Sequence, residues 1–275
     1  MFRNTLEQLR QKGALVHCIT NYVTVNDCAN AILAVGGAPI MADDIAEAAE
    51  ITGICSALVI NIGTLNERTI QSMIAAGKQA NLLGHPVILD PVGAGASTLR
   101  TQTVFKLLEM VKFDVIRGNI SEIKTVYAGT GTTNGVDADL SDALNDENQE
   151  EVIAYAKSLS LKTGAVIAIT GAVDLVTDGE KTYLIKNGHP MMSKITGTGC
   201  MLSAMIGAFC GANSKLILDA TVAAISFMGL CGELAYEKTA LVSGGTSTFK
   251  TFLIDAMSQI EGTRFEGGMK IENEA

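Results

Sequence analysis

The segment "PVILDPVG", residues 86–93, is an apolar run rich in β-branched side chains that ends in an acid, a proline and a glycine. Runs that are apolar throughout are typical of parallel strands covered on both faces, and turn residues mark their ends. The same pattern recurs at 14–19, 57–63, 114–119 and 165–171. These five segments therefore predict parallel strands.

Helical patterns lie between these strands. Two clear examples are residues 66–84 and 149–164, and the second ends at Gly164, a typical residue just past a helix C-terminus. Strands and helices that alternate along a chain indicate an α/β fold with a mostly parallel central sheet.

The pattern changes after residue 173. Residues 174–190 contain an Asp-Gly turn between two alternating segments, which predicts an antiparallel hairpin at an edge of the sheet. Three apolar helices are expected next, at about 200–212, 215–238 and 245–260, packed on one face of the sheet. The acidic segment 135–151 is expected to be a solvated connection that leads into a helix.

Composition and charge narrow the classes of partner. The 275 residues are 48% hydrophobic and 18% charged, enough for a large core, and no Pro/Ser linker or repeat divides them. We therefore expect one domain over residues 1–275. A net charge of -9 without any Lys/Arg cluster argues against a nucleic-acid partner. The apolar stretches 200–212 and 220–232 are shorter than the roughly 20 residues of a membrane span, so no membrane partner is expected.

The cysteines and the N-terminal segment indicate a cytoplasmic location. The six cysteines form no C-x-x-C pair, and a chain of this length needs no disulfide to stabilise it, so free thiols in a reducing compartment are expected. Residues 1–13 are amphipathic and charged and lack the apolar core of a signal peptide. We expect them to belong to the fold.

Polar, glycine-rich turns follow the predicted strands. They are residues 20–27, 90–95, 117–122, 170–174 and 196–200. Ligands of open α/β sheets bind outside the carboxyl ends of the strands, where these five turns would meet. The sequence therefore predicts a ligand site at that edge of the sheet.

Two acids and an arginine in these turns suggest the chemistry of the site. Taken alone, Asp90 is equally explained as a turn residue that caps the next helix, and Glu122 as an acid in the first turn of a helix. Together with Arg117 and a glycine-rich helix N-terminus, however, they match the needs of Mg²⁺ and a polyphosphate.

Cys200 lies at the start of an apolar helix, directly behind the glycines of "TGTGC" (196–200). A helix N-terminus presents unpaired N–H groups and partial positive charge, which favour an anion and a thiolate. Cys200 is therefore a candidate base or nucleophile, although an ordinary small core residue remains the alternative. A Cys–His nucleophilic pair is a weaker alternative.

Common nucleotide and zinc motifs are absent from the sequence. There is no G-x-x-x-x-G-K-[ST] segment, and Leu202 and Thr98 occupy the third glycine position of the two partial G-x-G-x-x-G matches. His17, His85 and His189 are scattered without zinc-ligand spacing. Walker-type, dinucleotide-binding and zinc functions are therefore disfavoured.

The chain resembles the hydroxyethylthiazole kinase family of the ribokinase-like superfamily. The resemblance rests on "HCITNYVTVN", "GGAPIMAD", "DPVGAG", "RGNISEI", "AITGAVD" and "TGTGC", in this order over most of the chain. It implies a three-layer α/β/α fold and transfer of the γ-phosphoryl group of ATP, with Mg²⁺, to the hydroxyl of 4-methyl-5-(2-hydroxyethyl)thiazole in thiamine salvage. It also implies a homotrimer with each site between two subunits.

The resemblance assigns expected roles to eight residues. Arg117 and Thr170 would contact ATP, Asp90 and Glu122 would hold Mg²⁺ directly or through water, Met41, Gly197 and Asn26 would line the thiazole pocket, and Cys200 would stand where wider relatives have an aspartate base. The apolar segment that contains Met41 would reach a neighbouring subunit's site.

Two positions depart from the pattern of the family. Thr198 replaces a common alanine, and residues 243–249 lack a proline often found there. Neither departure changes the expected function. The alternatives that remain are a kinase for another small alcohol, an ATP-dependent hydrate dehydratase on the same fold, and a non-catalytic binding module.

Overall fold

A single mixed sheet organises the chain. The computed structural model describes residues 2–129 and 148–274, and within them the strand order is β2-β1-β3-β4-β5-β6-β7-β8-β9. The strands are β1 (Leu15–Ile19), β2 (Ala38–Ile40), β3 (Ala57–Asn61), β4 (Val87–Asp90), β5 (Val115–Gly118), β6 (Val166–Ile169), β7 (Asp174–Thr177), β8 (Thr182–Ile185) and β9 (Ile271–Glu274). Pairing is parallel from β2 to β6 and antiparallel from β6 to β9.

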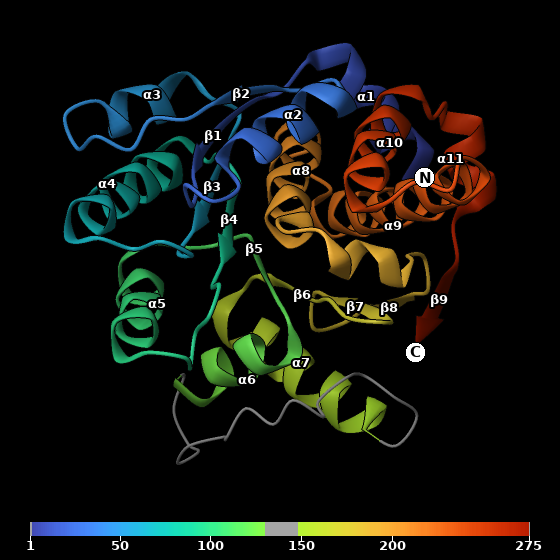
Figure 1. Cartoon of the computed structure of the whole chain (residues 1–275). Coiled ribbons are helices and arrows are strands. Elements are labelled where there is room, and N and C mark those ends of the chain that lie inside the picture. The colour runs from blue at the N-terminus through green and yellow to red at the C-terminus, as the bar shows by residue number, and fades with distance from the viewer. Residues whose placement is uncertain (1, 130–147, 275) are drawn as a thin grey trace.

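Helices cover both faces of this sheet (Figure 1). On one face lie α3 (Ala48–Ile54), α4 (Glu67–Leu83), α5 (Thr98–Met110), α6 (Ile120–Gly129) and α7 (Gln149–Thr163). On the other lie α1 (Phe2–Lys12), α2 (Val25–Val35), α8 (Thr198–Ala212), α9 (Ile217–Leu241), α10 (Thr246–Gln259) and α11 (Gly262–Gly268). The result is the expected three-layer α/β/α fold.

Two hydrophobic cores explain why the strands are apolar throughout. In β4, Ile88 packs into the core with α8 and α9, whereas Val87 and Leu89 pack into the core with α4 and α5. Alternate side chains of a strand point to opposite faces, and both faces of this sheet are covered. A polar residue within such a strand is therefore exceptional, which draws attention to Asn61 and Asp90.

The predicted elements lie close to the observed ones, but the two edges of the sheet and the C-terminal region differ from the prediction. The hairpin β7–β8 forms as expected but is not an edge, because β9 pairs with the outer side of β8. The prediction missed β9 because its sequence, Ile-Glu-Asn-Glu, has no apolar run, and α11 because it is short. It also missed β2, which has only three residues.

The acidic segment 135–151 can be compared with the structure only in part. Residues 135–147 lie outside the described residues, and the rest leads into α7 as expected. Gly164 follows α7 with a left-handed φ of 71°, the conformation of a glycine C-cap. The C-terminal helices were also predicted, although α9 extends three residues beyond the expected end, to Leu241.

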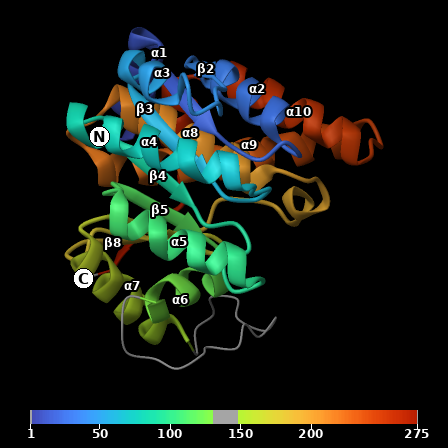
Figure 2. The ribbon, with the colours of Figure 1, turned by 90° about the vertical axis from the view of Figure 1, so that its left-hand side faces the viewer.

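The helix α9 is the one element of the described residues that is long and apolar enough to cross a membrane. Of its most apolar window, 78% is buried inside the fold, between α8, α10 and the sheet, as in the core helix of a globular protein. At its far end the turn into α10 projects from the molecule (Figure 2).

The helix α8 lies unusually close to the sheet. A Cβ atom on Gly207 would lie 2.4 Å from Val59 Cγ2 and 3.1 Å from Val16 Cγ1, so only glycine allows this approach. The close packing fixes α8 against β1 and β3. Its N-terminus thereby points at the carboxyl ends of the strands, where the candidate site lies.

Candidate active site

Cys200 lies in the first turn of α8 and is held by two amides. Asn21 Nδ2 donates to Cys200 Sγ at 3.2 Å, and Asn61 Nδ2 donates to it at 3.4 Å. Asn21 follows β1 and Asn61 ends β3, so the sulfur sits over the ends of two adjacent strands. Asn21 also donates to Asn61 Oδ1 at 3.0 Å, which fixes the two amides relative to each other.

Asp90 ends β4 beside Asn61 and is fully buried. Its Oδ2 accepts hydrogen bonds from Asn61 Nδ2 at 2.8 Å and from Ser203 Oγ at 2.7 Å. Arg117 Nη1 lies 3.7 Å from the same oxygen. The other oxygen, Oδ1, is buried and has no hydrogen-bond partner among the described residues. An unpartnered buried carboxylate oxygen is costly, and a bound cation would satisfy it.

Burial raises the pKa of Asp90 to about 6, because a charged carboxylate loses its hydration inside the protein. Arg117 lowers this pKa, Glu122 raises it through like charge, and the hydrogen bonds from Ser203 and Asn61 lower it. The carboxylate is therefore ionised at neutral pH but is held there against a desolvation cost.

Arg117, at the end of β5, connects this acid to the start of α8. Its side chain is 12% exposed, and the guanidinium donates through Nη2 to Thr170 Oγ1. A Cβ atom on Gly199 would lie 2.7 Å from Arg117 Nη1, so the guanidinium packs directly on the glycine of the first helical turn. Within residues 2–129 and 148–274, its Nε has no hydrogen-bond partner. The cation and the free N–H groups of the helix start thus face the same space, which suits phosphate oxygens.

Glu122 is committed to the backbone in this structure. Its Oε1 accepts the N–H of Gly93 at 2.8 Å and its Oε2 accepts the N–H of Asn119 at 2.9 Å. It lies in the first turn of α6, as the simpler interpretation of the sequence predicts. Each oxygen keeps a second lone pair, so a role toward a metal through water is compatible with these bonds.

The donor set fits Mg²⁺ better than a structural transition metal. In the parts of the chain that the structure describes, no three His, Cys, Asp or Glu side chains gather to hold a metal. Asp90 and Glu122 would supply two hard oxygen ligands or water contacts. Mg²⁺ prefers this arrangement and completes its shell with water and substrate phosphates.

A pocket of about 710 Å³ adjoins this cluster. Its lining includes Arg117, Thr170, Asp174, Thr198, Leu202 and Met228. Asp174 Oδ1 accepts the N–H of Gly171 at 2.9 Å, and burial raises the pKa of Asp174 to about 7. The lining combines these charged groups with apolar side chains from α8 and α9, a combination that is typical of pockets for small molecules.

The residues expected to line the thiazole pocket are less closely gathered. Gly197 caps α8 with φ 91°, and a Cβ there would lie 2.8 Å from Thr24 Cγ2. Asn26 is exposed on α2, where it accepts a hydrogen bond from Asn30 at 3.0 Å. Met41 follows β2 and packs against the α8 side of the core. Within the described residues, no hydrogen bond joins Asn26 to Cys200 or Asp90.

Four side chains of this cluster were not singled out from the sequence: Asn21, Asn61, Asp174 and Ser203. Asn61 carried a signal, because it is a polar residue at the end of an otherwise apolar strand. Ser203 follows Cys200 by three residues, so it lies on the same face of α8. Asn21 and Asp174 fall inside quoted turns but have no pattern of their own.

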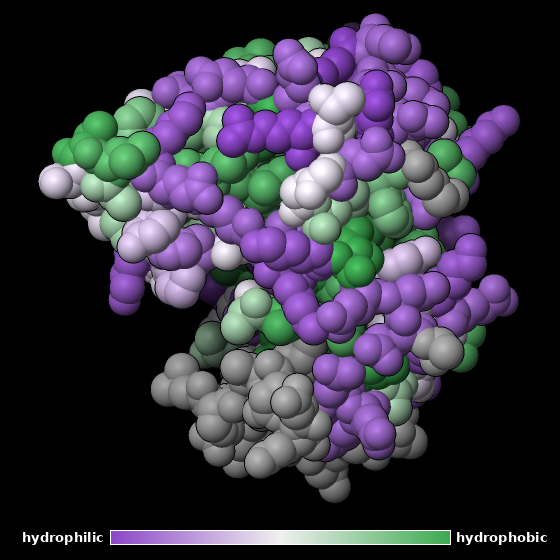
Figure 3. Space-filling model, turned by 90° about the vertical axis from the view of Figure 1, so that its right-hand side faces the viewer, coloured by the Kyte–Doolittle hydropathy of each residue, from purple (hydrophilic) through white to green (hydrophobic). Residues whose placement is uncertain are grey.

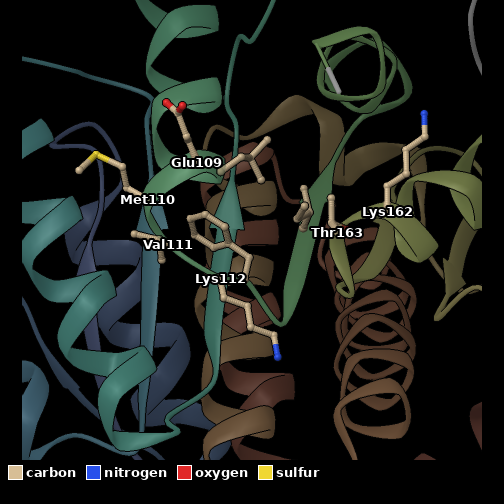
Figure 4. Close-up of a pocket in the computed structure, with 9 residues that line it drawn as sticks. Glu109, Met110, Val111, Lys112, Lys162 and Thr163 are labelled. Atoms are coloured by element: carbon tan, nitrogen blue, oxygen red, sulfur yellow. The ribbon is translucent and has the colours of Figure 1, made fainter. Parts of the chain in front are cut away.

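A second pocket, of about 690 Å³, lies near the opposite edge of the sheet, where α5 and α7 end. Its two lysine side chains, Lys112 and Lys162, point apart (Figure 4). Lys162 Nζ lies over the ring of Tyr127, 4.7 Å from its centroid. This pocket therefore contributes nothing to the cluster around Asp90.

The comparison with protein-family models is decisive for the family. The model of the hydroxyethylthiazole kinase family matches residues 6–263. The chain belongs to this family of kinases. A hydroxyethylthiazole kinase of Clostridium acetobutylicum is 56% identical over 273 residues, which cover 99% of this chain and 100% of the relative. One of Clostridium beijerinckii is 54% identical and covers 97% of this chain and 95% of the relative.

Solved structures agree with this assignment. The structure of a hydroxyethylthiazole kinase protein from Pyrococcus horikoshii OT3 aligns with a TM-score of 0.89 and 34% identity, covering 100% of this chain and 99% of that one. A pyridoxal kinase of Staphylococcus aureus in complex with pyridoxal aligns with a TM-score of 0.58 and 16% identity over 80% and 87% of the chains. That likeness concerns the fold, which is ribokinase-like.

The buried Asp90 makes a prediction for stability. Its folded pKa, about 6, is above the ordinary value of 3.8, so ionisation opposes folding. This penalty of ionisation is absent below about pH 4 and grows as the pH rises through 6. Above pH 6 it reaches roughly 3 kcal/mol, because the folded pKa and the ordinary pKa differ by about 2.2 and a difference of one corresponds to about 1.36 kcal/mol. In EDTA, Asp90→Asn should therefore gain stability relative to the wild type as the pH rises from 4.5 to 7.5, measured by urea unfolding.

The exposed Asp43→Asn variant controls for the loss of one carboxylate. A stability difference between wild type and Asp90→Asn that stays constant across this pH range would contradict the prediction.

Proposed function

We propose that the protein transfers the γ-phosphoryl group of ATP to the hydroxyl of 4-methyl-5-(2-hydroxyethyl)thiazole, in the thiamine salvage pathway of the cytoplasm. The observation that carries the proposal is the meeting of Asp90, Arg117 and Cys200 at the start of α8, next to the 710 Å³ pocket. Relatives named for this activity match over 97–99% of the chain, which supports the choice of substrate.

The nucleotide would occupy the 710 Å³ pocket with its phosphates toward Arg117. Arg117 and Thr170 already share a hydrogen bond and would exchange part of it for phosphate oxygens. The first N–H groups of α8, beginning at Thr198, would receive the transferring group and stabilise its charge. Asp90 and Glu122 would hold Mg²⁺, which neutralises phosphate charge when bound.

Cys200 would lie at the acceptor side of the reaction. The new bond forms between the hydroxyl oxygen of the thiazole and the γ-phosphorus, and the bond from this phosphorus to the bridging oxygen of ADP breaks. The thiolate of Cys200 would accept the hydroxyl proton and become the thiol, while the amides of Asn21 and Asn61 hold its sulfur in place. Positioning and charge supply most of the acceleration in phosphoryl transfer, so this proton transfer is a modest contribution.

The thiazole would bind beside Gly197, in a site completed by a second subunit of a homotrimer. Met41 and Asn26 would act there, on the exposed side of β2 and α2. Exposed apolar side chains support such an interface, since Tyr22 and Val23 are 78% and 57% exposed beside β1. The projecting turn after α9 carries Leu241 and Val242, 86% and 58% exposed, and a hydrophobic group is visible at the projection on the left of Figure 3.

The proposed reaction predicts one product. Purified protein incubated with ATP, Mg²⁺ and the hydroxyethyl thiazole should give the thiazole phosphate and ADP in equal amounts, detected by mass spectrometry. ADP and inorganic phosphate formed without thiazole phosphate would exclude this substrate and favour a kinase for another alcohol or an ATP-dependent hydrate dehydratase. Nucleotide-induced stabilisation without any turnover would favour a binding module.

The proposed role of Cys200 predicts a graded series of rates. Cys200→Ser should retain measurable activity, Cys200→Asp should equal or exceed the wild type because a carboxylate is the better base, and Cys200→Ala should lose about 10- to 100-fold in kcat. Initial rates at saturating substrates measure the series. An unchanged rate in Cys200→Ala would refute a role in proton transfer.

The trimer predicts a mass in solution. Size-exclusion chromatography with light scattering should give three times the 28.8 kDa mass of the chain. A monomer with full activity would refute a site shared between subunits.

A further inference from the structure

Arg100, in the first turn of α5, reaches back to two loops at the edge of the site. Its Nη2 donates to the carbonyl oxygen of Gly63 at 2.7 Å, and its Nη1 donates to the carbonyl oxygen of Val92 at 3.1 Å. Gly63 lies two residues past β3, and Val92 lies two residues past β4. One guanidinium therefore ties together the exits of two adjacent strands.

The peptide between Val92 and Gly93 is held at both ends. Arg100 donates to its carbonyl oxygen, and Glu122 Oε1 accepts its N–H at 2.8 Å. The positive end of the peptide dipole thus faces a carboxylate and the negative end faces a guanidinium. Opposite charges on the two sides allow this peptide plane one favourable orientation.

The glycine at position 93 is part of this arrangement. Its φ is 72°, and a Cβ there would lie 2.1 Å from Arg100 Nη1. Only glycine lets the guanidinium lie against the loop. The segment from Asp90 to Arg100 therefore forms a closed loop, because Arg100 hydrogen-bonds to the carbonyl oxygen of Val92, two residues after Asp90.

The hydrogen bond from Arg100 Nη2 to Gly63 connects Arg100 to Asp90 through Asn61. Gly63, whose carbonyl Arg100 holds, donates its N–H to Asn61 Oδ1 at 2.9 Å. Asn61 in turn donates to Asp90 Oδ2 and to Cys200 Sγ. The guanidinium is therefore linked to the buried carboxylate from both β3 and β4 without touching it.

We propose that Arg100 is a positioning residue for phosphoryl transfer, which orients the Val92–Gly93 peptide and Asn61 so that Asp90 can hold its cation. The proposal rests on the proposed function, because it concerns the metal and the phosphates of that reaction. Arg100 contacts neither; it acts through the two backbone carbonyls.

Arg100→Met removes both donors and keeps most of the length of the side chain. We expect kcat to fall at least tenfold, the Mg²⁺ concentration for half-maximal rate to rise about tenfold, and the KM for the thiazole to stay within threefold of the wild type. Arg100→Lys, which can reach one carbonyl, should recover part of both losses. Arg264→Met, at an exposed position of α11, is the matched control and should match the wild type.

A role in stability alone would lower the melting temperature and leave the Mg²⁺ dependence and kcat of the folded protein unchanged. That result would overturn the proposal. If Arg100→Met does not fold, Gly93→Ala supplies a second route, because its methyl group would displace the guanidinium. Gly93→Ala should lower kcat less in the Arg100→Lys background than in the wild-type background. Strictly additive losses of the two substitutions would count against the proposal.

Titration of Mg²⁺ into protein saturated with ADP separates this proposal from the choice of substrate. Weaker Mg²⁺ binding in Arg100→Met supports the positioning role even if the wild type fails to phosphorylate the thiazole. Equal Mg²⁺ binding in the two proteins refutes it, even if the wild type is an active thiazole kinase.

Discussion

The burial of one carboxylate at the end of β4 is the constraint on which the rest of the site depends. Asp90 has no access to water, so its charge must be balanced by the protein. Asn61, Ser203 and Arg117 meet this need on one oxygen, and the other oxygen has no partner in the part of the chain that the structure describes. Replacing any of these neighbours changes the cost of keeping Asp90 charged, because each of them, or a cation, offsets part of its desolvation.

The same constraint explains why the approach of α8 to the sheet is so close. Ser203 and Cys200 reach the strand ends because Gly207 lets the helix lie directly on Val59 and Val16. A helix at an ordinary distance would leave Ser203 too far from Asp90 for its 2.7 Å hydrogen bond. Packing in the core, one turn below the site, thus sets the geometry of polar contacts at its surface.

The sequence predicted those elements whose formation depends on residues adjacent in the chain. Continuous apolar runs predicted the buried parallel strands, and glycines after them predicted the turns that carry Asp90, Arg117 and Cys200. The short β2 and the polar β9 escaped because their pairing depends on neighbours distant in the sequence rather than on their own residues. The roles of Asn61 and Arg100 were not predicted for a related reason. Their hydrogen-bond partners follow other strands, and only the folded sheet brings these strand ends together.

The site is assembled from parts that are remote along the chain, and this has a consequence for folding. The hydrogen bond from Asn21 to Cys200 joins residues 179 positions apart, and the one from Ser203 to Asp90 spans 113. Closing such large loops is slow and entropically unfavourable until the sheet between them exists. No early intermediate with only the N-terminal strands can possess the site. Catalytic activity should therefore be among the last properties to appear during refolding.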